Sequence, residues 1–134
     1  MQRTWIIFYF ILIATVSLGL KLYTVDFTVL PSEDTFGYVL RGMAHNNGDF
    51  TEHPRKTLGW SIFISPFFHT TDSNNFLDYL NIARVLGLMI SLITIVPMYL
   101  LSRKFFDAKY SICAVGLFAF EPHLNHVSGL GMTE

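Results

Sequence analysis

The chain has 134 residues, of which 51% are hydrophobic, 16% aromatic and only 14% charged. Soluble domains carry about a quarter charged residues, so this composition excludes a disordered chain, a coiled coil and a nucleic-acid-binding protein, and it indicates a membrane protein. The formal net charge of −1 offers no basic field to attract polyanions. Because the single Cys113 lies inside an apolar run, the cysteine count indicates nothing about the redox compartment.

The first apolar block runs without charge from Thr4 to Leu20, between Arg3 and Lys21. As a helix it covers about 26 Å, and a Lys21 side chain that snorkels to the headgroups would let it fill a hydrocarbon core of about 30 Å. We predict a span near residues 4–22. A cleaved signal peptide is the alternative, but the block has no small-x-small cleavage site and is long for a signal sequence.

The second block, from Val85 to Ser102, predicts a span near residues 80–102, bent near Pro97 because proline frees a helical carbonyl. The third block, Tyr110 to Phe120, is too short to cross alone. With its flanks it predicts a third span near residues 106–121.

The last residues, 127–134, have the pattern of the first turns of a helix, and no signal for the end of that helix follows. We therefore expect residues 1–134 to form a single incomplete domain, a fragment of an all-α membrane protein.

Basic residues indicate the sidedness of the chain. Arg3 precedes the first span, and Arg103, Lys104 and Lys109 lie between the second and third. By the positive-inside rule, both places are cytoplasmic. We therefore expect an integral, multi-pass protein with a cytoplasmic N-terminus and a long external loop over residues 23–79.

The external loop begins with an amphipathic helix that starts at Glu33 and Asp34 and ends before Gly48. Its expected apolar face contains Phe36, Val39, Leu40, Met43 and Ala44, and its expected polar face contains Asp34, Tyr38, Arg41 and His45. The two acids at its start have an ordinary explanation as well, because carboxylates in the first turn favour the helix dipole and Ser32 is a common N-cap.

A second short helix is expected over the apolar residues Trp60 to Phe68, too short to span and therefore interfacial, with Trp60 as an anchor at headgroup level. Arg55 and Lys56 precede it, where lipid phosphates lie. They could contact anionic headgroups generally, or clamp the phosphate of one lipid substrate.

The order of these parts resembles the N-terminal part of the GT-C integral-membrane glycosyltransferases. It is most similar to the branch that contains the dolichyl-phosphate-mannose protein mannosyltransferases and the lipid A aminoarabinose transferases. The resemblance covers nearly the whole chain. Its motifs are Glu33-Asp34-x-x-x-Tyr38-x-x-Arg41, His53-Pro54 with Lys56, Asn81-x-x-Arg84, Tyr99 to Lys104, and Glu121-Pro122 followed by Ser128 and Thr133-Glu134.

The resemblance implies transfer of a sugar from a polyprenyl-phosphate donor lipid to a hydroxyl of a protein, lipid or glycan acceptor, at the external face of the membrane. Asp34 is the expected catalytic base and Glu33 its competitor, while cations stabilise the departing phosphate. The expected substrate-binding residues are Tyr38, Arg41, His53, Arg55, Lys56 and Glu134.

Whether a divalent cation takes part stays open. Glu134 could be a second acid of the site or a metal ligand, whereas His45, His53, His123 and His126 have no metal-binding spacing and are expected to be solvated. Two other functions remain: a multi-span transporter whose outer loop is a lid, with Asp34 paired to Arg41, and a non-catalytic membrane subunit.

Overall fold

A computed structural model describes residues 2–30, 33–51, 58–69, 71 and 73–131, and within these ranges every regular element is a helix. The elements are α1 (Gln2–Thr24), α2 (Glu33–Asn46), α3 (Leu58–Phe68), α4 (Phe76–Ile93), α5 (Ile95–Ser102), α6 (Ala108–Ala119) and α7 (Pro122–Leu130). The predicted all-α architecture is confirmed for these residues.

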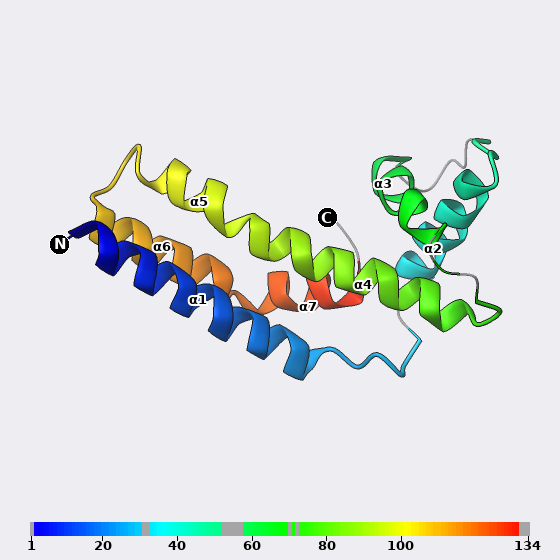
Figure 1. Cartoon of the computed structure of the whole chain (residues 1–134), viewed down its shortest axis with the longest axis horizontal. Helices are drawn as coiled ribbons and strands as arrows, with labels where there is room; N and C mark the ends of the chain where they lie inside the picture. The colour runs from blue at the N-terminus through cyan, green and yellow to red at the C-terminus, as the bar shows by residue number, and fades with distance from the viewer. Residues whose placement is uncertain (1, 31–32, 52–57, 70, 72, 132–134) are drawn as a thin grey trace.

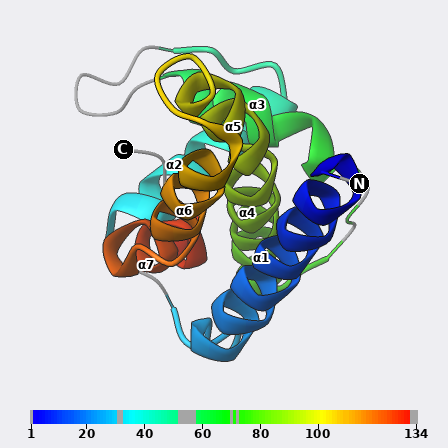
Figure 2. The same cartoon turned by 90° about the vertical axis from the view of Figure 1, so that its left-hand side faces the viewer.

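The helices form a bundle of three rods, made of α1, of α4 with α5, and of α6 with α7 (Figures 1 and 2). The N-terminus and the turn between α5 and α6 lie at one end of the bundle. The small helices α2 and α3 lie at the opposite end, packed on each other and on α4. Residues 103–107 therefore share an end of the bundle with the N-terminus. The charge pattern predicts that these two parts lie on the same side of the membrane.

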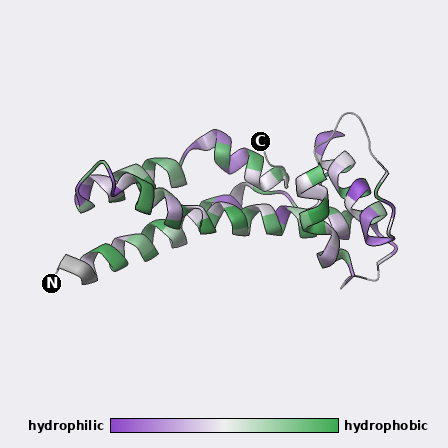
Figure 3. Cartoon of the chain, turned by 90° about the horizontal axis from the view of Figure 1, so that it is seen from above, coloured by the Kyte–Doolittle hydropathy of each residue, from purple (hydrophilic) through white to green (hydrophobic). Residues whose placement is uncertain are grey.

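Two helical stretches, Thr4–Thr24 and Phe76–Ser102, are long and apolar enough to cross a membrane. Only 11% and 22% of their most apolar windows are buried inside the protein. A core helix of a soluble protein would be mostly buried, whereas many apolar side chains of both helical stretches are exposed. Figure 3 shows that both stretches consist largely of hydrophobic residues. The bounds agree with the first and second predicted spans.

The second span is interrupted at Thr94, between α4 and α5. Pro97 has no N–H to donate to the carbonyl of Ile93, one turn earlier, and its ring crowds that carbonyl. At the interruption, the N–H and the hydroxyl of Thr94 both donate to the carbonyl of Ile90, over 2.9 and 2.8 Å. The irregularity expected near Pro97 is thus a break in the helical ladder one turn upstream.

Helix α6 agrees with the predicted third span, residues 106–121, to within two residues at each end. Helix α6 has 12 residues and a length of about 18 Å. It ends because Glu121 precedes Pro122 and is extended, with ψ 121°, as the residue before a proline prefers. Glu121 then caps α7 by accepting the N–H of Leu124.

The helix expected to begin near residue 127 is wrong. Residues 127–130 form the last turn of α7, and Gly131 caps it in the left-handed conformation, φ 74°. Glycine tolerates this conformation, and the cap donates its N–H back to Ser128 and Val127. Residues 132–134 lie outside the described residues.

Lys21 does not snorkel to a headgroup. Its side chain is 2% exposed, and its ammonium donates to the side-chain oxygen of Asn125 and, over 3.2 Å, to the hydroxyl of Ser128. One turn earlier, the hydroxyl of Ser17 donates to the carbonyl of Ala119 over 3.0 Å. Both contacts tie α1 to the third rod, so α1 ends among polar partners inside the protein.

Both helices predicted in the long loop are present, but two members of the expected polar face of α2, Arg41 and His45, are buried. The buried residues of α2 are Thr35, Val39, Arg41, Gly42 and His45. The reason is the close approach of α3: a Cβ on Gly42 would lie 2.8 Å from the ring of Phe68. Phe36 and Leu40, which belong to the expected apolar face, are more than 40% exposed.

The polar side chains of α2 are covered by the chain that follows it. After Gly48 (φ 82°), residues 49–51 turn back over the helix. His45 Nδ1 donates to the carbonyl of Asp49 over 3.0 Å, and its ring stacks on Phe50 with centroids 4.9 Å apart. Arg41 Nη2 donates to the carbonyl of Thr51 over 3.5 Å. The expectation of a solvated His45 is therefore wrong.

Trp60 is not at the surface as a headgroup anchor. It is 6% exposed and its indole N–H donates to the carbonyl of Gly131 over 2.8 Å. This bond joins α3 to the end of α7. Around it, a core cluster connects α2, α3 and α4 through Val39, Ile64, Phe68, Leu80 and Ala83.

Trp60→Phe removes the indole donor while retaining an aromatic side chain. We expect it to lower stability by about 1–2 kcal/mol, because the carbonyl of Gly131 loses its partner. Thermal unfolding in detergent measures the effect, with Trp5→Phe as the control, since Trp5 is exposed on α1. Equal melting temperatures for the two variants would contradict a structural role of the indole bond.

Candidate binding cavity

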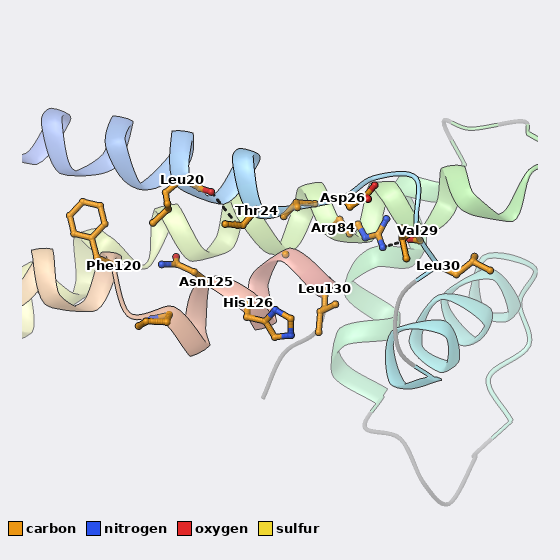
Figure 4. A pocket seen from close by; sticks show the side chains of 13 residues that line it. Leu20, Thr24, Asp26, Val29, Leu30, Arg84, Phe120, Asn125, His126 and Leu130 are labelled. Carbon is orange, nitrogen blue, oxygen red and sulfur yellow. Dashed lines mark hydrogen bonds between the residues drawn. The ribbon is translucent and has the colours of Figure 1, made fainter.

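A cavity of about 520 Å³ lies where α1 ends, between the segment after α1 and helix α7 (Figure 4). Most of its wall is apolar and comes from Leu20, Val25, Leu30, Phe120 and Leu130 among others. Its polar lining consists of Thr24, Asp26, Arg84, Asn125 and His126. An apolar wall with few polar groups is typical of a site for a small or amphiphilic ligand.

Arg84 is the most deeply buried charge of this lining, with 3% of its surface exposed. Nη1 donates to the side chain of Asn81 over 3.0 Å, and Nη2 donates to the carbonyl of Val29 over 2.6 Å. Within the described part of the chain, Nε has no hydrogen-bond partner and no carboxylate forms an ion pair with the guanidinium. Arg84 thus holds the segment after α1 and retains free donors.

A second buried cation, Lys21, adjoins the cavity through Asn125, which lines it. Lys21 has two neutral partners, the side chains of Asn125 and Ser128. Asparagine and serine oxygens satisfy the donors of an ammonium but do not neutralise its charge. The inner part of the cavity is therefore electropositive.

Asp26 brings the opposite charge to the cavity from the segment after α1. Its carboxylate accepts the hydroxyl and the N–H of Thr28, over 2.6 and 2.8 Å, and these bonds hold the pKa of Asp26 below its usual value. Asp26 is consequently ionised at neutral pH. It is exposed, and it interacts with Arg84 only through the longer-range field between them.

Small residues bring α7 against α4 and thereby shape the cavity wall. A Cβ on Gly87 would lie 2.8 Å from the carbonyl oxygen of Ser128, and one on Gly131 would lie 2.9 Å from the backbone nitrogen of Arg84. Gly129 similarly admits Val25, whose methyl would lie 2.6 Å from a Cβ. A side chain at any of these three positions would clash with the neighbouring segment. Because all three are glycines, α7 can lie directly on α4 and on the segment after α1.

The start of α2 is tied to the same wall. The hydroxyl of Thr35, fully buried, donates to the carbonyl of Leu130 over 2.9 Å, and Leu130 lines the cavity. The predicted acids Glu33 and Asp34 belong to this first turn of α2, and both are exposed. The turn that carries them is therefore fixed beside the cavity.

The other predicted substrate-binding residues are not brought together by the described structure. Tyr38 is half-buried within α2, and Arg41 lies beneath residues 49–51. His53, Arg55, Lys56 and Glu134 lie outside the described residues. Among the described residues, no group of three histidine, cysteine or acidic side chains could hold a metal ion.

Sequence reasoning missed four polar residues of this region: Lys21, Asp26, Asn125 and His126. It quoted Arg84 only as part of a motif. A signal was present only for Arg84, because a charged residue within an apolar stretch usually faces a protein interior or a water-filled cavity.

Comparison of the chain with models of protein families, with curated proteins and with solved structures finds no match. The resemblance to GT-C glycosyltransferases consequently stays a prediction.

Proposed function

We propose that this chain is the N-terminal part of a membrane glycosyltransferase that takes a sugar from a polyprenyl-phosphate donor. The sugar passes to a hydroxyl of a protein, lipid or glycan acceptor. Asp34 acts as the base that removes the proton from this hydroxyl. Residues 23–79 face the outside of the cell in this proposal, and the N-terminus faces the cytoplasm.

The hydrogen bond from Thr35 to Leu130 is the observation that carries the proposal. It fixes the acidic first turn of α2 beside a cavity whose wall is apolar and whose depth is electropositive. A donor of this class has the matching parts: an apolar chain, an anionic phosphate and a sugar. A carboxylate beside the sugar is the group that the transfer requires.

The chemistry needs few protein groups. The bond between the anomeric carbon and the phosphate oxygen breaks, and the phosphate leaves with its negative charge, so it needs no proton from an acid. The acceptor oxygen forms the new bond to the anomeric carbon and gives its proton to Asp34. Cations close to the phosphate stabilise the developing charge in the transition state.

The proposed orientation is supported from both ends of the bundle. Arg103 and Lys104 are exposed at the end that also holds the N-terminus, as the positive-inside rule requires of a cytoplasmic face. At the other end, exposed apolar side chains of α2 and α3 suit helices that lie on a membrane surface: Phe36, Leu40, Ile62, Phe63 and Phe67.

The proposal is tested in membranes that contain the full gene product, supplied with a radiolabelled polyprenyl-phosphate sugar. We expect label to move to a hydroxyl-bearing acceptor, with no transfer when the same sugar is supplied as its nucleotide derivative. Membranes from cells without the gene product are the control. Transfer from the nucleotide sugar alone, or equal transfer in both membrane preparations, would refute the proposal.

A further inference from the structure

Two buried cations lie at the cavity: Arg84 is part of its wall, and Lys21 adjoins it through Asn125. Arg84 is 3% exposed and Lys21 is 2% exposed, and in the described residues neither forms an ion pair with an acid. The acid that faces Arg84 is Asp26, which is exposed. Burying an unpaired charge is costly, so such a site is best satisfied by an anion from outside the chain.

Arg84 is the group that an anion would meet. Its bonds to Asn81 and Val29 use two of the five N–H donors of the guanidinium. These two bonds also fix the plane of the guanidinium, so the remaining donors are already oriented. A planar guanidinium with free donors matches the oxygens of a phosphate, which accept hydrogen bonds from it in pairs.

The remaining wall indicates what else the ligand carries. Leu20 and Phe120 line the cavity on the side of the spans, while Asp26 and His126 are exposed (Figure 4). The cavity therefore combines an apolar side, an electropositive interior and an exposed polar side. This arrangement of apolar and polar walls matches a ligand in which a phosphate carries a hydrocarbon chain on one side.

We propose that this cavity binds the phosphate of an amphiphilic phosphate ester, and that Arg84 holds the phosphate oxygens. This inference rests on the proposed function, which supplies the ligand, a polyprenyl phosphate. It assigns recognition of the phosphate to Arg84 instead of to Arg55 and Lys56. Asn125, held by Lys21, lines the same interior. Binding does not require the transfer reaction, so it can be measured separately.

The test is calorimetric titration of the purified chain in an uncharged maltoside detergent with farnesyl phosphate. We expect farnesyl phosphate to bind at least about tenfold more tightly than farnesol or inorganic phosphate, because only it fills both parts of the site. Arg84→Gln should weaken binding by at least about tenfold. Arg103→Gln, which changes an exposed arginine at the far end of the second span, should leave binding unchanged.

A second variant separates binding from folding. Asp26→Asn removes the negative charge nearest Arg84 but retains an oxygen that can accept the bonds from Thr28. We expect it to bind farnesyl phosphate about twofold to fivefold more tightly than the unaltered chain. A misfolded protein would not gain affinity, so this result would support a phosphate next to Arg84.

Several results would overturn the inference. They are equal affinity of Arg84→Gln and the unaltered chain, equal binding of farnesol and farnesyl phosphate, and weaker binding by Asp26→Asn. Inorganic phosphate that binds as tightly would identify a free-anion site, and displacement by equimolar phosphatidylglycerol would identify a general headgroup site. If farnesyl phosphate binds through Arg84 but the gene product transfers no sugar, the proposed function fails and the phosphate site stands.

Discussion

Asp34→Asn is expected to lower the rate of sugar transfer by about 10²- to 10⁴-fold in the full gene product, the range typical of losing a general base. Asparagine has nearly the same shape but cannot take the proton of the acceptor hydroxyl. The first turn of α2 should stay in place, because Thr35 retains its bond to Leu130. Binding of farnesyl phosphate should therefore be unaltered, and the loss should appear in kcat rather than in the KM of the donor.

Two variants make this result specific. Asp49→Asn changes another exposed carboxylate of the same loop and retains the oxygen that accepts the N–H of Thr51, so we expect unchanged transfer. Glu33→Gln separates the two neighbouring acids, since Glu33 occupies the same turn. If Glu33→Gln abolished transfer and Asp34→Asn did not, the base would be Glu33 and the present assignment would be wrong.

Gly87→Leu is expected to destabilise the folded chain by about 3 kcal/mol. The new side chain would meet the carbonyl oxygen of Ser128, which lies 2.8 Å from where the first carbon would be. That oxygen belongs to backbone and cannot rotate aside, so α7 would have to leave α4. The separation would open the cavity wall and pull Lys21 from Asn125 and Ser128.

The matched control is Gly19→Leu in α1, where a Cβ would meet nothing within 4 Å. Both changes add the same side chain to an apolar span. Thermal unfolding followed by the loss of monodisperse protein in detergent compares them, and we expect a lower midpoint only for Gly87→Leu. Equal midpoints would show that α7 does not lie against α4 at Gly87.

Much of the fold was predictable because long apolar blocks of the right length have few alternatives. The two spans agree with Thr4–Thr24 and Phe76–Ser102, and the two loop helices agree with α2 and α3. Helix α7 was not foreseen, although its signals were in the sequence. Glu121-Pro122 is a signal for the start of a helix, and Gly131 is a signal for its end. Residues 127–134, which include Gly131, were interpreted as the beginning of another helix.

The faces of the helices were harder to predict than their bounds. Helical periodicity gave α2 a polar face with Arg41 and His45, yet both are buried on the side where α3 approaches Gly42. A hydrophobic pattern weighs side chains by polarity and gives a glycine little weight, even where its small size allows the contact. Arg41 and His45 could be buried because residues 49–51 supply backbone acceptors.

The polar interior of the cavity was missed for a related reason. Lys21 was expected to reach lipid headgroups, which is the usual behaviour of a lysine at the end of a span. Its partners, Asn125 and Ser128, lie more than 100 residues later in a helix that the apolar pattern did not reveal. Only the tertiary arrangement shows that they adjoin it.

Photo-crosslinking tests the central claim, that a prenyl-phosphate head occupies the cavity at the end of the bundle beside α2. The chain, reconstituted in nanodiscs, is irradiated with a prenyl phosphate carrying a diazirine on its first isoprene unit, and the labelled peptides are sequenced. We predict adducts on residues 20–30 and 120–130, and their loss in Arg84→Gln. Adducts confined to residues 103–110, at the opposite end of the bundle, would contradict the account.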